Sequence, residues 1–201
     1  MVLGRSLMAA KKIRYAVVGL GHIAQVAVIP AFAHARRNSE LAAIVSGDRT
    51  KRRELSRRYR IKHAFDYDQF DDCLRVVDAV YIALPNSMHA EYTIRAAQAG
   101  VHVLCEKPMA VTSEECRQMI AACRKAKVKL MTAYRLHFEA LNLAAIDLAR
   151  SGTLGELKFF NSSFSMTVRR GDIRTKRASG GGTLYDIGVY CINAARCLFR
   201  S

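Results

Sequence analysis

A Gly-x-Gly-x-x-Ala pattern near the start of the chain combines residue types suited to binding phosphate groups. It comprises Gly19, Gly21 and Ala24, and it stands between the apolar run Ile13–Val18 and a helical pattern over Ile23–Ala35. Gly19 permits a tight turn, Gly21 lets the backbone approach a pyrophosphate, and Ala24 lets the helix pack closely on a sheet. The helix start adds free N–H groups and the positive end of a dipole. The pattern therefore predicts a dinucleotide-binding turn with contacts from Gly19, Gly21, His22 and Ile23.

The second predicted strand ends at Ser46, where dinucleotide-binding chains place the residue that contacts the adenine ribose. An acidic residue there is typical of NAD, whereas a neutral residue followed by cations accommodates the 2′-phosphate of NADP. Ser46 can donate a hydrogen bond, and Lys51 with Arg49 or Arg52 supplies positive charge. Asp48 is the counter-argument, because it could be a ribose ligand shifted by two positions. The pattern favours NADP over NAD, with Ser46 and Lys51 at the 2′-phosphate.

Strand and helix patterns alternate along most of the chain. Further strand patterns cover residues 41–46, 79–84, 101–105 and 129–133, and helical patterns cover 50–59, 69–76, 87–99, 113–125 and 138–150. This order predicts an α/β fold, a Rossmann-type doubly wound parallel sheet with helices on both faces. After a boundary near Ser151–Gly152, residues 157–168 show a longer strand pattern, and Gly180–Gly182 opens a helix to about Phe199. We expect a flexible leader over residues 1–12, a dinucleotide-binding domain over 13–150 and the beginning of a second domain over 151–201.

The composition indicates an ordinary globular protein with an unusual excess of positive charge. Its 201 residues include 32 Lys and Arg against 17 Asp and Glu, a formal net charge of +15. Because the sequence contains no helix-turn-helix, RNA-binding aromatic motif or zinc finger, we interpret the basic residues as solvated helix faces and expect no nucleic-acid partner. No apolar run approaches the roughly 20 residues that cross a bilayer. The six cysteines form no C-x-x-C pair or zinc-ligand spacing, so we expect no metal site and reduced thiols in a cytoplasmic protein.

The later part of the chain contains four further motifs: Leu84-Pro85-Asn86-Ser87-Met88-His89, Cys105-Glu106-Lys107-Pro108, Ala133-Tyr134-Arg135 and the run from Gly180 to Tyr190. Together they resemble the motifs of the glucose–fructose oxidoreductase and inositol dehydrogenase (Gfo/Idh/MocA) family. The resemblance extends from about Lys12 to the last residue. The Ser-Gly-x-x-x-Lys stretch, the segment around Tyr67, Tyr-Arg-Leu-His and the triple glycine look most similar to the glucose–fructose oxidoreductase branch, whose members hold NADP.

The resemblance implies an NADP-dependent oxidoreductase that moves a hydride between a sugar or polyol carbon and the nicotinamide. Tyr190 would then be the acid–base group, Asp186 would bind a substrate hydroxyl, and Lys107 would orient the hydroxyl and favour the Tyr190 phenolate. Asp186 and Tyr190 are four residues apart, so a helix presents both on one side. The implied substrate contacts are Lys107, Tyr134, His137, Asp186 and Tyr190, and the implied cofactor contacts beyond the glycine turn are Ser46, Lys51, Tyr67, Leu84, Pro85, Asn86, His89, Glu106, Lys107 and Arg135.

Each candidate also has a purely structural interpretation. Lys107 could simply end a strand, Tyr190 could be a core aromatic residue, and Asp186 could cap a helix. His89 is explained more simply as a residue that caps or packs at the start of its helix, while His137 stands at a strand end where substrate contact is open to it.

Members of the family continue past the position of Ser201 into an α+β domain with an open, mostly antiparallel sheet, which forms the substrate-pocket wall and the oligomer interface. We therefore expect this chain to be a fragment, and full-length relatives to be homo-oligomers. A second function class is a non-catalytic, NADP-responsive regulatory or binding protein, since the family includes co-repressors that sense NADP. The truncation and the charge of +15 favour that class, whereas Glu106-Lys107-Pro108 and Asp186-x-x-x-Tyr190 favour the enzyme.

Overall fold

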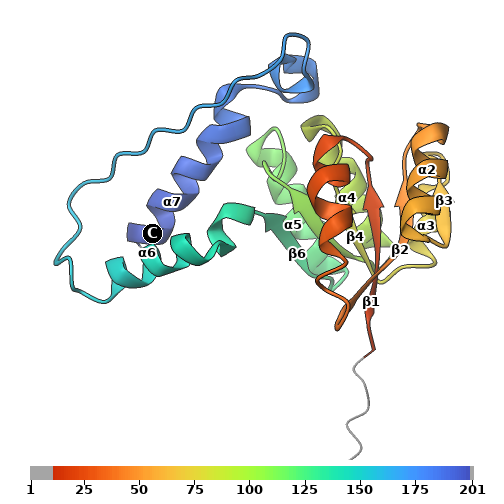
Figure 1. Cartoon of the computed structure of the whole chain (residues 1–201), viewed down its shortest axis with the longest axis horizontal. Helices are drawn as coiled ribbons and strands as arrows, with labels where there is room; N and C mark the ends of the chain where they lie inside the picture. Colours follow the sequence, from red (N-terminus) through yellow and green to blue (C-terminus); the bar gives the residue numbers. More distant parts are fainter. Residues whose placement is uncertain (1–10, 200–201) are drawn as a thin grey trace, which may run out of the picture.

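Six short segments form the strands of one parallel sheet in the computed structural model, which describes residues 11–199 (Figure 1). The sheet order is β3-β2-β1-β4-β5-β6, and the order reverses between β1 and β4. In doubly wound sheets ligands bind outside the carboxyl ends of the strands at such a reversal. The strands are β1 (Ile13–Val18), β2 (Ser39–Val45), β3 (His63–Phe65), β4 (Ala79–Ile82), β5 (His102–Glu106) and β6 (Leu130–Ala133).

Helices cover both faces of the sheet. Successive side chains of a strand point to opposite faces, so each strand contributes apolar residues to both layers. Val17 and Ile44 pack on one face with the first two helical segments, while Val18 and Val45 pack on the other with the next three. The first face carries the π-helical turn η1 (Ala24–Val28) with α1 (Ile29–Ala31), and α2 (Arg49–Tyr59); the second carries α3 (Phe70–Leu74), α4 (His89–Gln98) and α5 (Ser113–Lys125). The predicted Rossmann-type sheet is confirmed.

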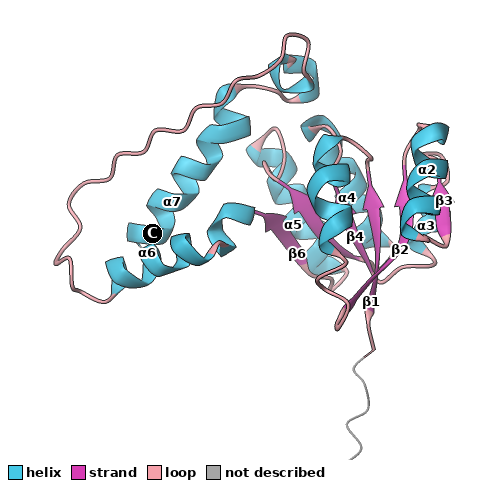
Figure 2. Cartoon of the chain, viewed as in Figure 1, coloured by secondary structure: helices cyan, strands magenta, loops and turns pink. Residues whose placement is uncertain are grey.

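The chain beyond the sheet consists of helices and a long extended connection. It contains η3 (Arg135–Phe138), α6 (Ala140–Arg150), η4 (Ile173–Thr175), η5 (Arg177–Ser179), η6 (Leu184–Gly188) and α7 (Val189–Phe199). The prediction of a strand over residues 157–168 is wrong: this segment is an extended loop that pairs with no other strand (Figure 2). A strand requires a neighbour to accept and donate its backbone hydrogen bonds. Within residues 11–199 no such neighbour lies beside it, and no antiparallel sheet is present.

The remaining expectations concern the leader, the thiols and the membrane. Ten of the twelve residues of the predicted leader lie outside the described part of the chain, which begins at Lys11. All six cysteines lie inside it and are free thiols. No helix in the described range has both the length and the apolar character to cross a bilayer.

Candidate active site

The predicted dinucleotide turn lies at the carboxyl end of β1, in the middle of the sheet. Gly19 has a φ of +95°, and a Cβ there would lie 2.5 Å from the carbonyl oxygen of Ala83. At Gly21 an added Cβ would meet no atom of the described chain within 4 Å, so the space above the turn is open. Ala24, the first residue of η1, is completely buried. Each small residue therefore has a steric reason: the first two for a sharp turn with an open approach, the third for close packing.

The carboxyl end of β2 forms a second corner, centred on Ser46. The Asp48 carboxylate caps α2 by accepting a hydrogen bond from the N–H of Lys51 at 3.0 Å, and this bond is the main cause of a lowered pKa for that carboxyl group. The Arg52 guanidinium donates to the carbonyl of Ser46 and to Asp66 at 2.6 Å. Asp48 and Arg52 are thus engaged by the protein itself, and Lys51, whose side chain is about half exposed, pairs with Asp48 through Nζ, 3.4 Å from Oδ2.

The ring of Tyr67 closes this corner on the other side. A Cβ on Gly47 would lie 3.4 Å from that ring, so Tyr67 covers the turn that follows Ser46. In the sheet order β2 and β5 are three strands apart, which is about 14 Å at the usual strand spacing. An extended dinucleotide can span that distance from the Ser46 corner to the end of β5.

Lys107 directly follows β5 and makes the central ion pair of the site. Its Nζ donates to Asp186 Oδ1 at 2.8 Å and to the Asp186 carbonyl at 2.5 Å, and the two side chains are only 14% and 17% exposed. Glu106 accepts from the Lys107 N–H at 3.2 Å and from the hydroxyl of Tyr81 at 2.7 Å. The bond between Lys107 and Pro108 is cis. Asp186 is engaged by this lysine rather than acting as a helix cap.

Tyr190 lies against the same ion pair, four residues after Asp186. Lys107 Nζ is 5.1 Å from the centroid of its ring, and Tyr134 packs edge-on against it with the centroids 6.2 Å apart. The expectation that Lys107 would favour the phenolate is wrong: the pKa of Tyr190 is raised, chiefly by burial and then by the Glu106 carboxylate. Neither the charge of Lys107 nor that of Arg135, which lowers the pKa, offsets the desolvation.

His89 lies beneath the site, completely buried. Its ring nitrogens are 2.9 Å from the carbonyl oxygen of Pro108 and 3.0 Å from that of Leu84, and burial lowers its pKa. His89 therefore ties the turn after β4 to the turn that carries Lys107, instead of presenting its ring to a ligand. In the same turn, Asn86 donates through its amide to the carbonyl of Gly180 at 2.8 Å.

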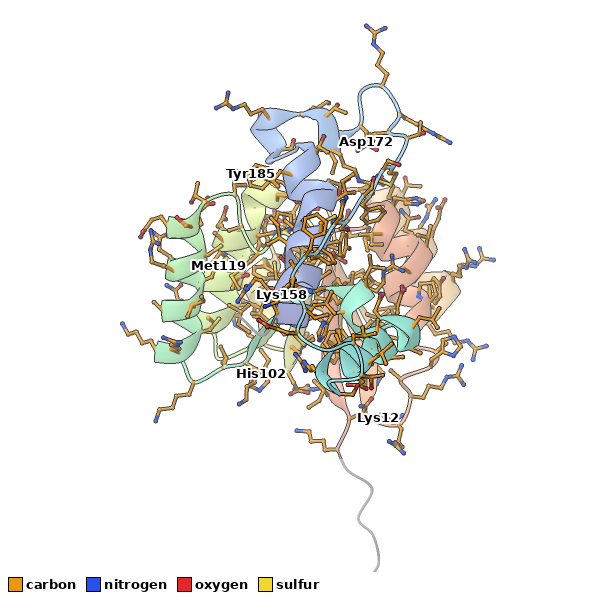
Figure 3. The ribbon with its side chains drawn as sticks, turned by 90° about the vertical axis from the view of Figure 1, so that its left-hand side faces the viewer. Lys12, His102, Met119, Lys158, Asp172 and Tyr185 are labelled. Carbon is orange, nitrogen blue, oxygen red and sulfur yellow. The ribbon has the colours of Figure 1, made fainter. Side chains whose placement is uncertain are left out.

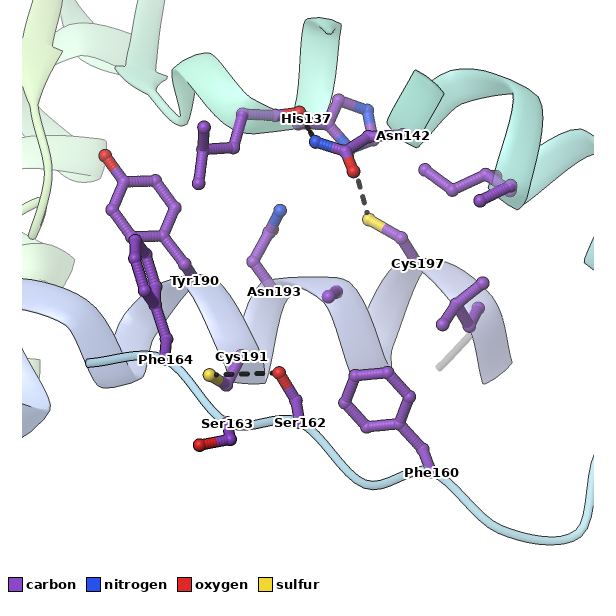
Figure 4. Close-up of a pocket in the computed structure, with 15 residues that line it drawn as sticks. His137, Asn142, Phe160, Ser162, Ser163, Phe164, Tyr190, Cys191, Asn193 and Cys197 are labelled. Carbon is purple, nitrogen blue, oxygen red and sulfur yellow. Dashed lines mark hydrogen bonds between the residues drawn. The ribbon is translucent and has the colours of Figure 1, made fainter. Parts of the chain in front are cut away.

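A pocket of about 450 Å³ extends from Tyr190 between α6, α7 and the extended segment (Figure 4). His137 lines it, with Nδ1 3.4 Å from Sγ of Cys197, and Phe160 and Phe164 form its apolar wall. The predicted substrate residues Lys107, Tyr134, Asp186 and Tyr190 thus gather at one place, with His137 further along the pocket.

Arg135 is near enough to Tyr190 for its charge to lower the pKa of that phenol, against the net rise. Its side chain is 66% exposed and lies 3.9 Å from Glu139. Two residues that touch the site were not predicted from sequence, namely Tyr81 on β4 and Arg174 on η4, whose Nε is 3.5 Å from Asp186 Oδ2. The cluster of cations before the triple glycine was a signal for Arg174, whereas nothing in the strand pattern of β4 singled out Tyr81.

A doubly wound sheet with a glycine turn at its reversal and a polar site at its carboxyl edge defines a dinucleotide-binding protein. Residues 13–134 match the model of an oxidoreductase family with an NAD-binding Rossmann fold, and residues 143–201 match the GFO/IDH/MocA C-terminal domain. The chain belongs to the Gfo/Idh/MocA oxidoreductase family.

Solved structures and curated proteins of this family are similar to nearly the whole chain. An aldose-aldose oxidoreductase from Caulobacter crescentus, complexed with glycerol, is 43% identical with a TM-score of 0.85 over 94% of this chain and 58% of its own. A 3-ketoreductase from Actinomadura kijaniata in complex with NADP and TDP-benzene is 33% identical with a TM-score of 0.85 over 94% and 57%. A D-xylose 1-dehydrogenase (NADP(+)) of Haloferax volcanii is 36% identical over 90% of this chain and 56% of its own. The chain thus spans a little over half the length of these relatives.

Proposed function

We propose that the chain is the cofactor-binding and catalytic part of an NADP-dependent oxidoreductase, which transfers a hydride between the nicotinamide and a C–OH or C=O carbon of a sugar or polyol. The observation that carries the proposal is the Lys107–Asp186 ion pair against Tyr190, built at the carboxyl end of β5. This edge also carries the glycine turn, so a hydride donor and a proton donor can meet there.

The choice of NADP rests on the corner at the end of β2. Asp48, the one acidic residue in the stretch after the strand, is already bonded to the helix backbone, so its carboxylate is not free for ribose hydroxyls. We assign the 2′-phosphate to Ser46 and to Lys51, which is half exposed and would exchange its 3.4 Å pairing with Asp48 for the phosphate. The Tyr67 ring covers the adjacent Gly47. The residues present fit NADP better than NAD. Bound there, the cofactor accepts or supplies the hydride, and the chain supplies binding, orientation and proton transfer.

Proton transfer falls to Tyr190. A tyrosine carries its phenolic proton at neutral pH, and burial raises the pKa of Tyr190 further. Its hydroxyl can therefore donate that proton to a carbonyl oxygen as the hydride reaches the carbon. In the reverse direction the phenolate form of Tyr190 accepts the proton of the substrate hydroxyl, which restores the phenol. Lys107 Nζ directs the substrate oxygen, and Asp186 accepts from a neighbouring substrate hydroxyl. The glycine turn, Leu84, Pro85 and Asn86 would hold the cofactor beside them.

The relatives support a sugar or polyol as the substrate class. Their names include an aldose-aldose oxidoreductase, a D-xylose 1-dehydrogenase and a D-glucoside 3-dehydrogenase. We place the chain with the glucose–fructose oxidoreductase branch on its Tyr-Arg-Leu-His and triple-glycine motifs. A non-catalytic NADP-responsive binding protein is the alternative, and it predicts cofactor binding without hydride transfer.

The test compares Lys107→Met with Lys125→Met, an equivalent substitution at an exposed lysine at the end of α5. NADP⁺ binding is measured by calorimetry, and hydride transfer is followed by nicotinamide absorbance with a panel of aldoses and cyclic polyols. We expect Lys107→Met to lower hydride transfer by about 100-fold or more, since it removes a charged donor at the reacting oxygen. Its NADP⁺ affinity should stay within about threefold of the unchanged chain. Equal transfer by both variants would refute the role of Lys107, and NADP⁺ binding without transfer by the unchanged chain would favour the alternative.

A further inference from the structure

Helix α2 carries a row of arginines that the proposed function does not use. Residues 46–68 hold eight Lys and Arg against four Asp and Glu. The row consists of Arg49, Arg53 and Arg57, which are exposed and stand four residues apart. That spacing places them on one side of the helix, while Leu55 on the other side is buried. Figure 1 shows α2 at the right-hand edge of the molecule, so the row lies along an outer surface.

Most acidic residues in this part of the fold already have a cation partner. These ion pairs are Asp48–Lys51, Asp66–Arg52, Glu40–Lys62, Asp72–Arg75 and Asp71–Arg95. Within residues 46–68, the cations outside these pairs are five arginines, against only Glu54 and Asp68. No carboxylate of residues 11–199 pairs with the three arginines of the row. The outer side of α2 therefore has an excess of three positive charges.

Helix stability alone does not account for this row. Acidic side chains stabilise the first turn of a helix and cations destabilise it, because the helix dipole is positive there. The first turn of α2 contains no acidic residue and begins with Arg49, whereas α3 and α5 each have two acidic residues in theirs. Like charges four residues apart also weaken a helix. Within the row, the dipole favours only Arg57, in the last turn. The row thus has its explanation in an anion outside the helix.

We propose that Arg49, Arg53 and Arg57 draw the anionic cofactor to the Ser46 corner and speed the binding of NADP more than that of NAD. This inference rests on the proposed function, because it requires the 2′-phosphate at Ser46 and Lys51. Both cofactors carry a pyrophosphate, and the 2′-phosphate gives NADP further negative charge. A surface of one sign of charge raises the rate at which an oppositely charged ligand arrives. The row therefore acts on the association rate, whereas direct contacts at the corner act on the dissociation rate.

The length of the row sets how its effect depends on salt. From Arg49 to Arg57 the helix rises about 12 Å, at about 1.5 Å per residue. Electrostatic interactions extend about 30 Å at an ionic strength of about 10 mM and about 8 Å at about 150 mM. All three charges therefore act at the corner at low ionic strength, whereas at the higher value Arg57 is largely screened from it. The acceleration should fade as salt is added.

The test follows the binding of NADPH and NADH by stopped-flow nicotinamide fluorescence at these two ionic strengths. The variant Arg53→Gln/Arg57→Gln removes two charges of the row. Arg49 is left in place because it adjoins the corner. The variant Arg53→Lys/Arg57→Lys keeps the charge and changes the side chain, so it separates electrostatic attraction from any contact specific to a guanidinium.

The matched control is Arg124→Gln/Lys125→Gln, which removes two exposed cations at the end of α5. This end lies near His102, because the N–H of Lys129 donates to His102 Nδ1 at 3.0 Å. His102 begins β5 and marks the amino edge of the sheet, in the lower half of the molecule in Figure 3. The control therefore lowers the net charge by the same amount at the edge opposite the cofactor corner.

At about 10 mM ionic strength, we expect Arg53→Gln/Arg57→Gln to slow the association of NADPH about three- to tenfold and that of NADH about twofold or less. The dissociation rates should stay unchanged. Arg53→Lys/Arg57→Lys and the α5 control should associate at the rate of the unchanged chain. At about 150 mM the slowing for NADPH should shrink to less than about twofold.

Four results would overturn the inference: an unchanged association rate in Arg53→Gln/Arg57→Gln, a change confined to dissociation, the same slowing in the α5 control, or no rescue by lysine. The proposed function is judged separately. Accelerated NADPH binding without hydride transfer to any sugar or polyol would contradict the proposed function and support the inference. Hydride transfer with an association rate that ignores the row would do the reverse, and a folded chain that binds neither cofactor would contradict both.

Discussion

The ion pair between Lys107 and Asp186 should contribute measurably to stability as well as to chemistry. Removing one partner of a fully buried pair costs about 3–5 kcal/mol, and an exposed pair contributes about 0–1 kcal/mol. This pair is near the buried end, with side chains 14% and 17% exposed, and Asp186 retains Arg174 at 3.5 Å when the lysine is lost. We therefore expect Lys107→Met to lower the free energy of unfolding by about 2 kcal/mol, from the buried value reduced for the remaining partner.

A double-mutant cycle isolates the pair. Lys107→Met, Asp186→Asn and the double variant are unfolded in urea, and the interaction energy is taken from the four free energies of unfolding. The expected interaction energy is about 1–2 kcal/mol, because the bond is charge-assisted and mostly buried. The exposed pair Arg117–Glu114, 67% and 62% exposed, is the matched control and should give about 0.5 kcal/mol or less. An interaction energy no larger than that of the control would refute the reasoning about the site.

Three further predictions concern the rest of the chain. Gly180→Ala should destabilise more than Gly152→Ala by about 1–3 kcal/mol in urea, because both glycines have positive φ but only at Gly180 would the methyl group clash; equal losses would contradict the packing of this segment. Asp78 has a pKa lowered to about 2 from 3.8 by Arg14, so its contribution to stability is present above about pH 4 and is lost as the pH falls toward about 2. Asp78→Asn should abolish that part of the pH dependence of stability. A urea midpoint that varies with pH in the variant as it does in the unchanged chain would contradict the prediction. The buried Cys73 thiol, whose pKa is raised to about 12, should react with a thiol reagent only on unfolding, as mass spectrometry of the labelled cysteines would show.

The strands of the sheet and the helices between them could be predicted from the sequence because their determinants are local. Helix α5, for example, spans Ser113–Lys125 as predicted, since Thr112 and Glu115 form a capping box at its start. The short edge strand β3 was missed because three residues carry no periodic signal. The strand expected over residues 157–168 failed for the opposite reason: its pattern is local, but the partner that a strand needs is not.

The residues of the site could be predicted in part, but their contacts and pKa values could not. The resemblance of the later motifs to the Gfo/Idh/MocA family pointed to Lys107, Asp186 and Tyr190, and the fold brings the first two together across 79 positions of sequence. The pKa of Tyr190 could not be predicted, because it depends on burial and on Glu106, which come from separate elements. Arg174 was missed because its contact requires the clash-free backbone at Gly181, a property of the folded chain.

The most direct test of the account is a calorimetric titration with NADP⁺ and NAD⁺ of the unchanged chain, of Ser46→Asp and of Ser113→Asp, a control that adds the same charge at the start of α5. Charge-assisted hydrogen bonds to a 2′-phosphate predict about 10–100-fold tighter binding of NADP⁺ than of NAD⁺. Ser46→Asp should abolish or reverse that preference, and Ser113→Asp should leave it intact. Equal affinity for both cofactors, or binding of neither by a chain shown to be folded, would contradict the account.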